Sequence, residues 1–285
     1  MCSSIPALIM NSSRNFLDMI QDYIFFRPSV TQRDHKYVFS HTCPFEEIFL
    51  QPNYSTVSKP VLLHGLYFYT NLLLSTSPMH KPVRSKKGVC LVWHGNCGTL
   101  EQWGEMHDLF TLRGYDVLIM DYRTFGKSEG ALTEVGLLKD ALFVYDYLKT
   151  TCKFQDSQIV LHGVSIGTSI ATYTAANRPC RFVVLEMPFF NSADLIQKHV
   201  TLTNTKFFNR YIKFPFRTDK YILSVKCPVY GIHSLDDPII PYSSAYRLFE
   251  IIKLRRDCLL YTMNNGKHCV SGTPSYQFFI NTIYD

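Results

Sequence analysis

The chain has 285 residues and carries 29 Lys and Arg against 23 Asp and Glu, a formal net charge of +6 at pH 7. With 46% hydrophobic and 18% charged residues, its composition is that of a globular protein and excludes a disordered, collagen-like or coiled-coil chain. Its positive residues form no run of about five like charges, which predicts a solvated surface and no binding of nucleic acid.

The cysteines and the N-terminus indicate the compartment. Nine cysteines are scattered along the chain without a C-x-x-C pair. An odd number without regular spacing predicts neither a disulfide framework nor a zinc site. Residues 1–24 lack the basic start and apolar run of a secretory signal. We therefore predict a reducing environment and a cytoplasmic protein.

The N-terminal part is expected to form an extension over residues 1–44. Residues 14–24 place apolar side chains at helical spacing, which predicts a short amphipathic helix. This helix either packs on the rest of the chain or contacts a membrane surface peripherally.

Two apolar runs follow the extension. Residues 45–50 and 61–69, separated by a polar turn, predict an antiparallel pair of strands. The stretch 60–80 lacks Lys, Arg, Asp and Glu and approaches the ~20 residues of a membrane span. Pro60, His64, Gly65, Asn71 and Pro78 within it favour a buried strand followed by a loop.

From residue 88 onward, predicted strands and helices alternate. Apolar runs without strict polar alternation are typical of parallel strands that helices cover on both faces. The predicted strands are 89–93, 115–121, 158–162, 181–187, 228–232 and 258–262, and the predicted helices are 99–113, 133–150, 166–177, 242–253 and 273–283. This order predicts one doubly wound α/β domain over 45–285. The aromatic-rich interval 188–220 breaks the alternation and is either a small cap over a pocket mouth or an ordinary helical excursion.

The sequence Gly163-Val164-Ser165-Ile166-Gly167 is a G-x-S-x-G pentapeptide between a predicted strand and a predicted helix. A sharp strand-to-helix turn holds its serine in a strained backbone state, and glycines two before and two after remove side chains that would collide. Ser165 is therefore the candidate nucleophile, exposed at the start of a helix.

A serine hydroxyl needs a base to take its proton and a third group to orient that base. In this type of fold the acid follows a later strand and the histidine follows the last strand. The loop His233-Ser-Leu-Asp-Asp-Pro-Ile-Ile-Pro241 offers two carboxylates, Asp236 and Asp237. His268, just past the strand 258–262, is the candidate base.

A hydrolytic site also needs donors for an oxyanion. The amide N–H of Ile166, at the helix start, is one candidate, and the loop after the strand 89–93 is expected to supply the other. Glycines in this loop allow close approach of the backbone, and we assign the second donor to the N–H of Asn96, with Cys97 as the alternative. Glu101 and Trp103, in the next helix, are candidate pocket residues.

Four segments in this order resemble the α/β-hydrolase superfamily. They are His94-Gly-Asn96, Asp121-Tyr-Arg-Thr-Phe-Gly-Lys-Ser-Glu-Gly130, the pentapeptide around Ser165, and the loop 233–241 followed by His268. The first two most resemble small-cap serine hydrolases with abhydrolase domains, a group of lysophospholipases, monoacylglycerol lipases, protein depalmitoylases and esterases. Over residues 45–285 the resemblance implies an α/β-hydrolase fold: a mostly parallel, doubly wound sheet with an antiparallel N-terminal edge and a small cap.

The resemblance also implies which carboxylate is the acid. The family's loop reads roughly His-Gly-x-x-Asp-x-x-Val-Pro, which places the acid at Asp237. Ser234 stands where the family has glycine, and Pro238 follows the acid directly, so Asp236 remains the alternative.

The resemblance implies a serine hydrolase that cleaves an ester or thioester without a metal or an organic cofactor. Ser165 attacks the carbonyl, His268 relays the proton, and Asp237 orients the imidazole. The aromatic residues of 188–220 indicate an apolar acyl chain on a small-molecule or lipid substrate. Two alternatives are a serine peptidase of the oligopeptidase type, which uses the same triad, and a non-catalytic binding module, which typically lacks one member of it.

Overall fold

The computed structural model describes residues 25–41, 43–56, 58–70, 84–199, 212–255, 257–268 and 270–285. The predicted helix 14–24 lies outside the described residues, so its packing and its peripheral membrane contact stay predictions. Within the described ranges, no helix is both long enough and apolar enough to span a membrane.

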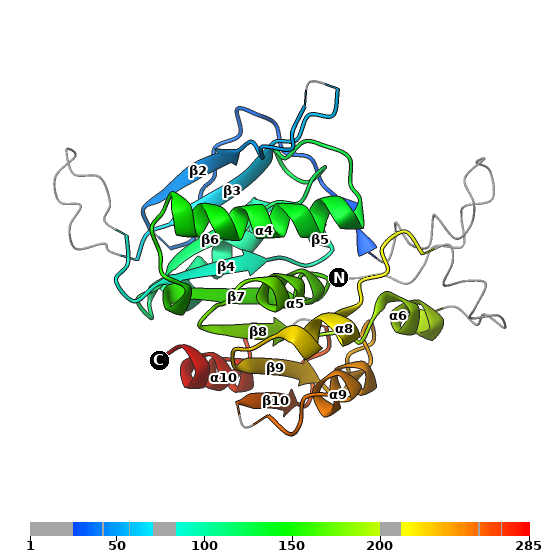
Figure 1. Ribbon diagram of the computed structural model, residues 1–285. Coiled ribbons are helices and arrows are strands. Elements are labelled where there is room, and N and C mark those ends of the chain that lie inside the picture. The colour runs from blue at the N-terminus through cyan, green and yellow to red at the C-terminus, as the bar shows by residue number, and fades with distance from the viewer. Residues whose placement is uncertain are drawn as a thin grey trace.

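The centre of the fold is a sheet with the strand order β10-β9-β8-β7-β4-β6-β3-β2 (Figure 1). Its strands are β2 (Phe45–Leu50), β3 (Leu63–Phe68), β4 (Val89–Trp93), β6 (Asp116–Met120), β7 (Ile159–Val164), β8 (Phe182–Glu186), β9 (Val229–Ser234) and β10 (Cys258–Met263). Only β3 runs opposite to the other strands of this sheet, pairing antiparallel with both β2 and β6. The predicted parallel sheet with an antiparallel N-terminal edge is therefore confirmed, and each strand begins and ends within two residues of its predicted range.

Helices cover both faces of this sheet, because its central strands bury their side chains alternately on the two sides. In β4, Leu91 packs in the core under α4 (Glu134–Thr150), α5 (Gly167–Asn177), α8 (Thr218–Ser224) and α9 (Tyr242–Glu250). Its neighbour Val92 packs in a second core under α2 (Leu100–Trp103), α3 (Asp108–Thr111) and α10 (Pro274–Tyr284). Figure 1 shows α4 and α5 in front of the sheet, on the first of these faces.

The predicted single helix over 99–113 is wrong, because the structure divides it into α2, the 3₁₀ helix η1 (Gly104–His107) and α3. The division begins at Gly104, where a Cβ atom would lie 2.3 Å from Cε1 of Phe39. The ring of Phe39 therefore occupies the space of a side chain there. The change from α-helix to 3₁₀ helix at Gly104 thus coincides with a contact to Phe39, a residue far away in the sequence. The helical spacing of apolar residues within 99–113 does not reveal that contact.

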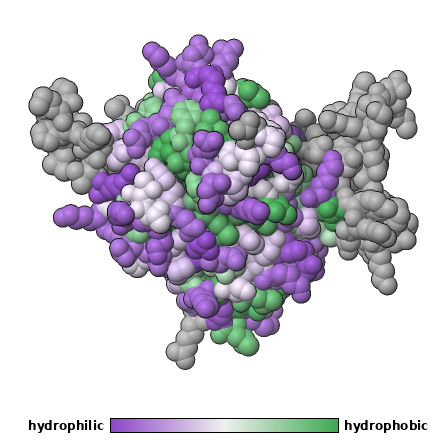
Figure 2. Space-filling model, turned by 45° about the horizontal axis from the view of Figure 1, so that its top comes forward, coloured by the Kyte–Doolittle hydropathy of each residue, from purple (hydrophilic) through white to green (hydrophobic). Residues whose placement is uncertain are grey.

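The remaining elements are short or lie outside the sheet. A two-stranded pair joins β1 (Arg27–Pro28) to β5 (Cys97–Gly98), η2 (Asp156–Gln158) precedes β7, and α6 (Ser192–His199) follows β8. On the surface, hydrophilic and hydrophobic side chains are interspersed over the face shown in Figure 2. Hydrophilic side chains are thus spread over this face without gathering in one patch.

Arg123 and Asp140 join the loop after β6 to α4. The guanidinium donates from Nε and Nη2 to the two carboxylate oxygens, both at 2.7 Å. The two side chains are only 9% and 4% exposed. Tyr54 donates to the same carboxylate at 2.6 Å. Because water does not solvate either side chain, each charge is stabilised mainly by the opposite charge of its partner.

Replacing Arg123 with methionine leaves the Asp140 carboxylate buried without its cation. We expect the free energy of unfolding to fall by about 3–5 kcal/mol, measured by urea denaturation. Arg178→Met is the matched control, because Arg178 makes the same two-pronged contact with Asp146 on α4, at 2.8 Å, with side chains 33% and 44% exposed. That exposed pair contributes about 0–1 kcal/mol, and equal losses in the two variants would contradict the role of burial.

Candidate active site

Ser165 occupies the turn between β7 and α5, and its backbone is left-handed, with φ of +54°. Its N–H donates to the carbonyl of Glu186 at the end of β8 (2.8 Å), and its carbonyl accepts from the N–H of Thr168 in the first turn of α5 (3.0 Å). Such a backbone costs about 1–2 kcal/mol for a residue with a side chain. These hydrogen bonds hold the serine there, at the carboxyl edge of the sheet.

The two glycines of the pentapeptide are required by packing. A Cβ atom on Gly163 would lie 2.4 Å from the carbonyl oxygen of Gly167, and one on Gly167 would lie 2.0 Å from the carbonyl oxygen of Trp93. Both distances are far below van der Waals contact. The turn around Ser165 is therefore tight because α5 begins directly against β7 and β4.

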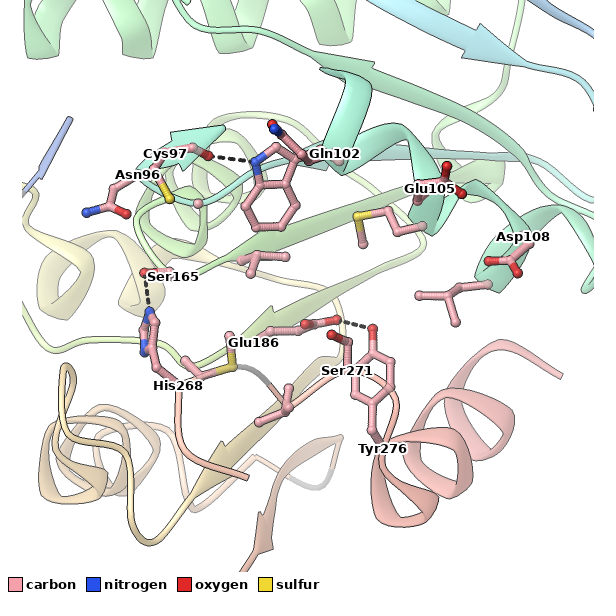
Figure 3. A pocket seen from close by; sticks show the side chains of 17 residues that line it. Asn96, Cys97, Gln102, Glu105, Asp108, Ser165, Glu186, His268, Ser271 and Tyr276 are labelled. Atoms are coloured by element: carbon pink, nitrogen blue, oxygen red, sulfur yellow. Dashed lines mark hydrogen bonds between the residues drawn. The ribbon is translucent and has the colours of Figure 1, made fainter. Parts of the chain in front are cut away.

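His268 and Asp237 lie in line with the serine hydroxyl. Nε2 of His268 is 3.1 Å from Oγ of Ser165, and Nδ1 of His268 is 2.8 Å from Oδ2 of Asp237. Figure 3 shows the imidazole reaching the serine from the loop after β10. The other carboxylate oxygen of Asp237 accepts from the N–H groups of Ile239 and Ile240, at 2.8 and 2.9 Å. The structure thus brings together three candidates that lie far apart in the sequence.

Asp236, the alternative acid, faces away from the imidazole and is exposed. Its carboxylate accepts from the hydroxyl of Ser234, which holds the pKa of Asp236 below its ordinary value, and from the N–H of Lys267 at 3.2 Å. The same Ser234 hydroxyl accepts from the N–H of Gly266 at 2.9 Å. Ser234, a departure from the family's glycine, therefore ties the loop of Asp237 to the loop of His268.

His233, at the end of β9, lies beneath the acid. Burial lowers the pKa of His233, so the ring is neutral and its Nε2–H donates to the carbonyl of Ile240 at 2.8 Å. The same nitrogen is 3.5 Å from Oδ2 of Asp237. His233 thus closes the turn that presents Asp237 without placing a second cation beside it.

The loop after β4 lies against the serine and is held by hydrogen bonds to its carbonyl groups. The hydroxyl of Tyr122 donates to the carbonyl of His94 (2.5 Å), and the indole of Trp103 donates to that of Cys97 (2.7 Å). The N–H of Arg27 in β1 donates to the carbonyl of Asn96 (2.7 Å). Because a peptide group is planar, fixing each carbonyl also fixes the direction of the following N–H. The carbonyl of Gly95, whose peptide carries the N–H of Asn96, lies 2.8 Å from Nδ1 of His94. Hydrogen bonds therefore orient the peptides that carry both candidate donors of this loop, Asn96 and Cys97.

A cavity of about 410 Å³ opens beside Ser165 and His268 (Figure 3). Asn96 and Cys97 line it at the end near the serine, while Ile166 stands at the start of α5. Apolar side chains line most of its wall, namely those of Trp103, Met106, Leu109, Val164, Met187 and Val270. The expectation for Trp103 is therefore met, whereas Glu101 lies elsewhere and pairs with His35 at 3.4 Å.

Glu186 is a cavity residue that the sequence reasoning missed. The residue is 3% exposed, and its carboxylate accepts from the hydroxyl of Tyr276 on α10 (2.6 Å) and from Nε2 of His162 on β7 (2.7 Å). Nδ1 of that imidazole lies 2.6 Å from the hydroxyl of Tyr284. A glutamate ending an otherwise apolar strand run was the available signal, since buried carboxylates are rare without partners.

The described aromatic residues of 188–220 do not line this cavity. Phe189, Phe214 and Phe216 are buried in the core under α4 and α5, where the last two contact the rings of Phe25 and Phe26. The apolar lining comes instead from the helices after β4, from the ends of β7 and β8, and from the loop after His268. Whether 188–220 caps the mouth depends on residues 200–211, which lie outside the described ranges, so the cap stays a prediction.

Within the described ranges, no group of three His, Cys, Asp or Glu side chains is arranged to hold a metal ion. The donor set around Ser165 is one imidazole and one carboxylate, which already bond to each other. The arrangement is suited to proton transfer from a hydroxyl.

The fold and this geometry define the class of protein. The sheet order, the serine turn after β7, and the acid and histidine loops after β9 and β10 are those of an α/β hydrolase. A model of the family described as serine aminopeptidase S33 matches residues 84–216. The chain has the fold of the α/β hydrolases, and its sequence resembles their abhydrolase-domain members.

Curated relatives and solved structures agree with this class. The lysophosphatidylserine lipase ABHD12 of Macaca fascicularis is 29% identical over 185 residues, which cover 59% of this chain and 46% of the lipase. The uncharacterized protein R595 of Acanthamoeba polyphaga mimivirus is 26% identical over 251 residues, covering 81% of this chain and 83% of that protein. This chain thus spans about half the length of the lipases it matches.

Two solved structures share the fold. An α/β hydrolase from Vibrio vulnificus superposes with a TM-score of 0.66 at 17% identity, covering 84% of this chain and 80% of that one. The esterase Pf2001 of Pyrococcus furiosus superposes with a TM-score of 0.61 at 16% identity, covering 90% of this chain and 96% of the esterase. At such low sequence identity, the superpositions show a shared fold.

Replacing Gly167 with alanine is expected to lower the free energy of unfolding by more than about 3 kcal/mol, because the new Cβ meets backbone that cannot move away. Gly114→Ala is the control. Gly114 has φ of +82°, and the nearest atom to its added Cβ is Cδ of Lys87 at 3.5 Å, so only the backbone cost of about 1–2 kcal/mol applies. Thermal unfolding of both variants measures the difference, and similar losses would contradict the packing argument.

Proposed function

We propose that this chain is a serine hydrolase that cleaves carboxylic esters through an acyl-enzyme intermediate. The observation that carries the proposal is the hydrogen-bonded series from Ser165 Oγ through His268 to Asp237, at 3.1 and 2.8 Å. A serine in a left-handed turn, with a histidine on its hydroxyl and a carboxylate behind the histidine, is the arrangement that activates a serine nucleophile.

Each residue has a defined role in the proposed reaction. Nε2 of His268 accepts the proton as Ser165 Oγ attacks the carbonyl, and it later gives that proton to the leaving group. Asp237 accepts from Nδ1–H, which keeps the lone pair of Nε2 facing the serine and stabilises the imidazolium. The N–H groups of Asn96 and Ile166 receive the oxyanion, and water then releases the acid by the same route.

The substrate proposed is an ester or a thioester with an apolar acyl chain, including lipid esters. Trp103, Met106, Leu109, Val164, Met187 and Val270 form an apolar wall beside the nucleophile. Burying each CH₂ group of an acyl chain against such a wall contributes about 0.8 kcal/mol. The lipase and esterase relatives also support cleavage of esters. The proposed steps use only protein side chains, backbone N–H groups and water.

A second candidate is a peptidase, because the matching family model is described as a serine aminopeptidase. The same triad cleaves amides, so the geometry around Ser165 favours neither bond type. The apolar cavity wall favours the ester. A non-catalytic binding module on this fold typically lacks a triad residue, whereas all three candidates lie within hydrogen-bond distance here.

Ser165→Ala is expected to abolish labelling by a fluorophosphonate probe and to lower ester hydrolysis by at least about 10⁴-fold. Ser169→Ala is the control: Ser169 is also buried on α5, and its hydroxyl bonds to Thr218, so labelling is retained. Equal labelling of the two variants would remove the nucleophile assignment. Aminoacyl anilides cleaved faster than p-nitrophenyl esters by the unmodified protein would favour the peptidase.

The acyl preference is tested with p-nitrophenyl esters from acetate to decanoate. We expect kcat/KM to rise with chain length until the cavity is filled, because each added CH₂ group leaves water for the apolar wall. A steady fall along the series would contradict the apolar acyl site while leaving the nucleophile assignment intact.

Asp237→Asn is expected to lower kcat by about 10⁴-fold, because an amide no longer fixes the imidazole tautomer. Asp236→Asn changes the neighbouring carboxylate in the same way. Because that side chain is exposed and bonds to Ser234, we expect kcat within about threefold of the unmodified protein. A larger loss at position 236 than at 237 would reverse the assignment of the acid.

A further inference from the structure

Two cysteines that are distant in the sequence meet at the amino edge of the sheet. The Sγ atoms of Cys180 and Cys227 are 3.3 Å apart. Cys180 stands two residues before β8 and Cys227 stands two residues before β9, and these strands pair in parallel from Val183 and Val229 onward. Strand pairing therefore brings the two thiols together.

The backbone around both thiols is held in place. The N–H of Val183 donates to the carbonyl of Pro228 at 2.9 Å. Arg255 donates from its two Nη atoms to the carbonyls of Val225 and Cys227, both at 2.6 Å. A disulfide bond is about 2.05 Å long, so the two sulfurs, 3.3 Å apart, need to approach by only about 1.2 Å.

Both thiols line a surface cavity of about 460 Å³ that also carries Arg178, Arg181 and Lys226. Asp146 pairs with Arg178, so Arg181 and Lys226 supply the net positive charge of this rim, which favours an anionic reactant over a neutral one. A hydrogen bond from the thiol of Cys180, aided by the charge of Arg255, lowers the pKa of Cys227, and the same contact raises the pKa of Cys180. Cys227 is therefore the thiol that ionises first.

We propose that Cys180 and Cys227 form a site of reversible thiol–disulfide exchange with an anionic low-molecular-weight disulfide, namely glutathione disulfide. The Cys227 thiolate attacks one sulfur of glutathione disulfide, which breaks the S–S bond and releases one glutathione thiolate. Cys180 then loses its proton and attacks Sγ of Cys227, releasing the second glutathione. Two protein thiols are oxidised to one disulfide, and one glutathione disulfide is reduced to two glutathiones.

The bond joins the two ends of the segment 180–227, which contains β8, α6, α8 and the aromatic interval. Closing a loop of this length removes conformational entropy from the unfolded chain and so stabilises the folded one. The thiols precede β8 and β9, whereas Ser165 and Asp237 follow the carboxyl ends of the same sheet. The bond therefore changes stability and leaves the hydrolytic site as it is.

The full-length protein is equilibrated in glutathione buffers of increasing oxidised fraction, and its disulfides are located by peptide mapping. We expect a disulfide between Cys180 and Cys227, accompanied by a rise in Tm of about 5–10 °C and reversed by dithiothreitol. Cys258→Ser is the matched control, because Cys258 is a partly exposed cysteine on the adjacent strand β10. We expect this variant to form the same disulfide and to show the same rise in Tm.

Single variants test the order of the two steps and need no hydrolytic activity. In Cys180→Ser, the mixed disulfide with glutathione accumulates on Cys227. In Cys227→Ser, Cys180 stays reduced, and neither variant shows the rise in Tm. Free thiols at both positions in fully oxidised glutathione, or a disulfide between Cys227 and Cys258, would overturn the proposal. A rise in Tm that persists in both single variants would overturn it as well.

Discussion

The left-handed backbone of Ser165 is the constraint on which the rest of the site depends. It exists because β7 ends and α5 begins within three residues, which leaves no room for a Cβ atom at Gly163 or Gly167. The same crowding presses α5 against the carbonyl of Trp93, so the loop that follows β4 lies directly beside the serine. Ser165 is 8% exposed rather than exposed as predicted, and it lines the cavity. One backbone conformation thus sets both the placement of Ser165 at the cavity and the position of the candidate oxyanion loop.

The other parts of the site reach the serine because parallel strands end at the same edge of the sheet. The loops after β9 and β10 carry Asp237 and His268, and the hydroxyl of Ser234 joins these loops through the N–H of Gly266. The N–H groups of Ile239 and Ile240 hold the carboxylate from behind. The proposed acid and base are therefore fixed before a substrate arrives, which lowers the cost of orienting them in the reaction.

The opposite edge of the sheet carries different chemistry. The amino ends of β8 and β9 bring two thiols to 3.3 Å among arginine and lysine side chains, while the carboxyl ends carry the serine site. The amino edge, with the two thiols, and the carboxyl edge, with the serine site, are one strand length apart. A covalent change at the amino edge can therefore adjust the stability of the fold without moving the hydrolytic groups.

The sequence by itself determined the strands, the serine turn and the histidine. Short apolar runs and paired glycines are local features that determine the backbone conformation of a segment. The order of the motifs along the chain then indicated which loop carries the histidine. The family resemblance favoured Asp237 as the acid and left Asp236 open, and the tertiary structure places the carboxylate of Asp237 on the imidazole. Neighbouring side chains on a turn point in different directions, so the sequence around them does not separate the two. The tertiary structure also decided that Glu186 enters the cavity, that Phe214 and Phe216 pack in the core, and that Cys180 meets Cys227. These contacts join segments far apart in the chain, and only the order of the strands brings them together.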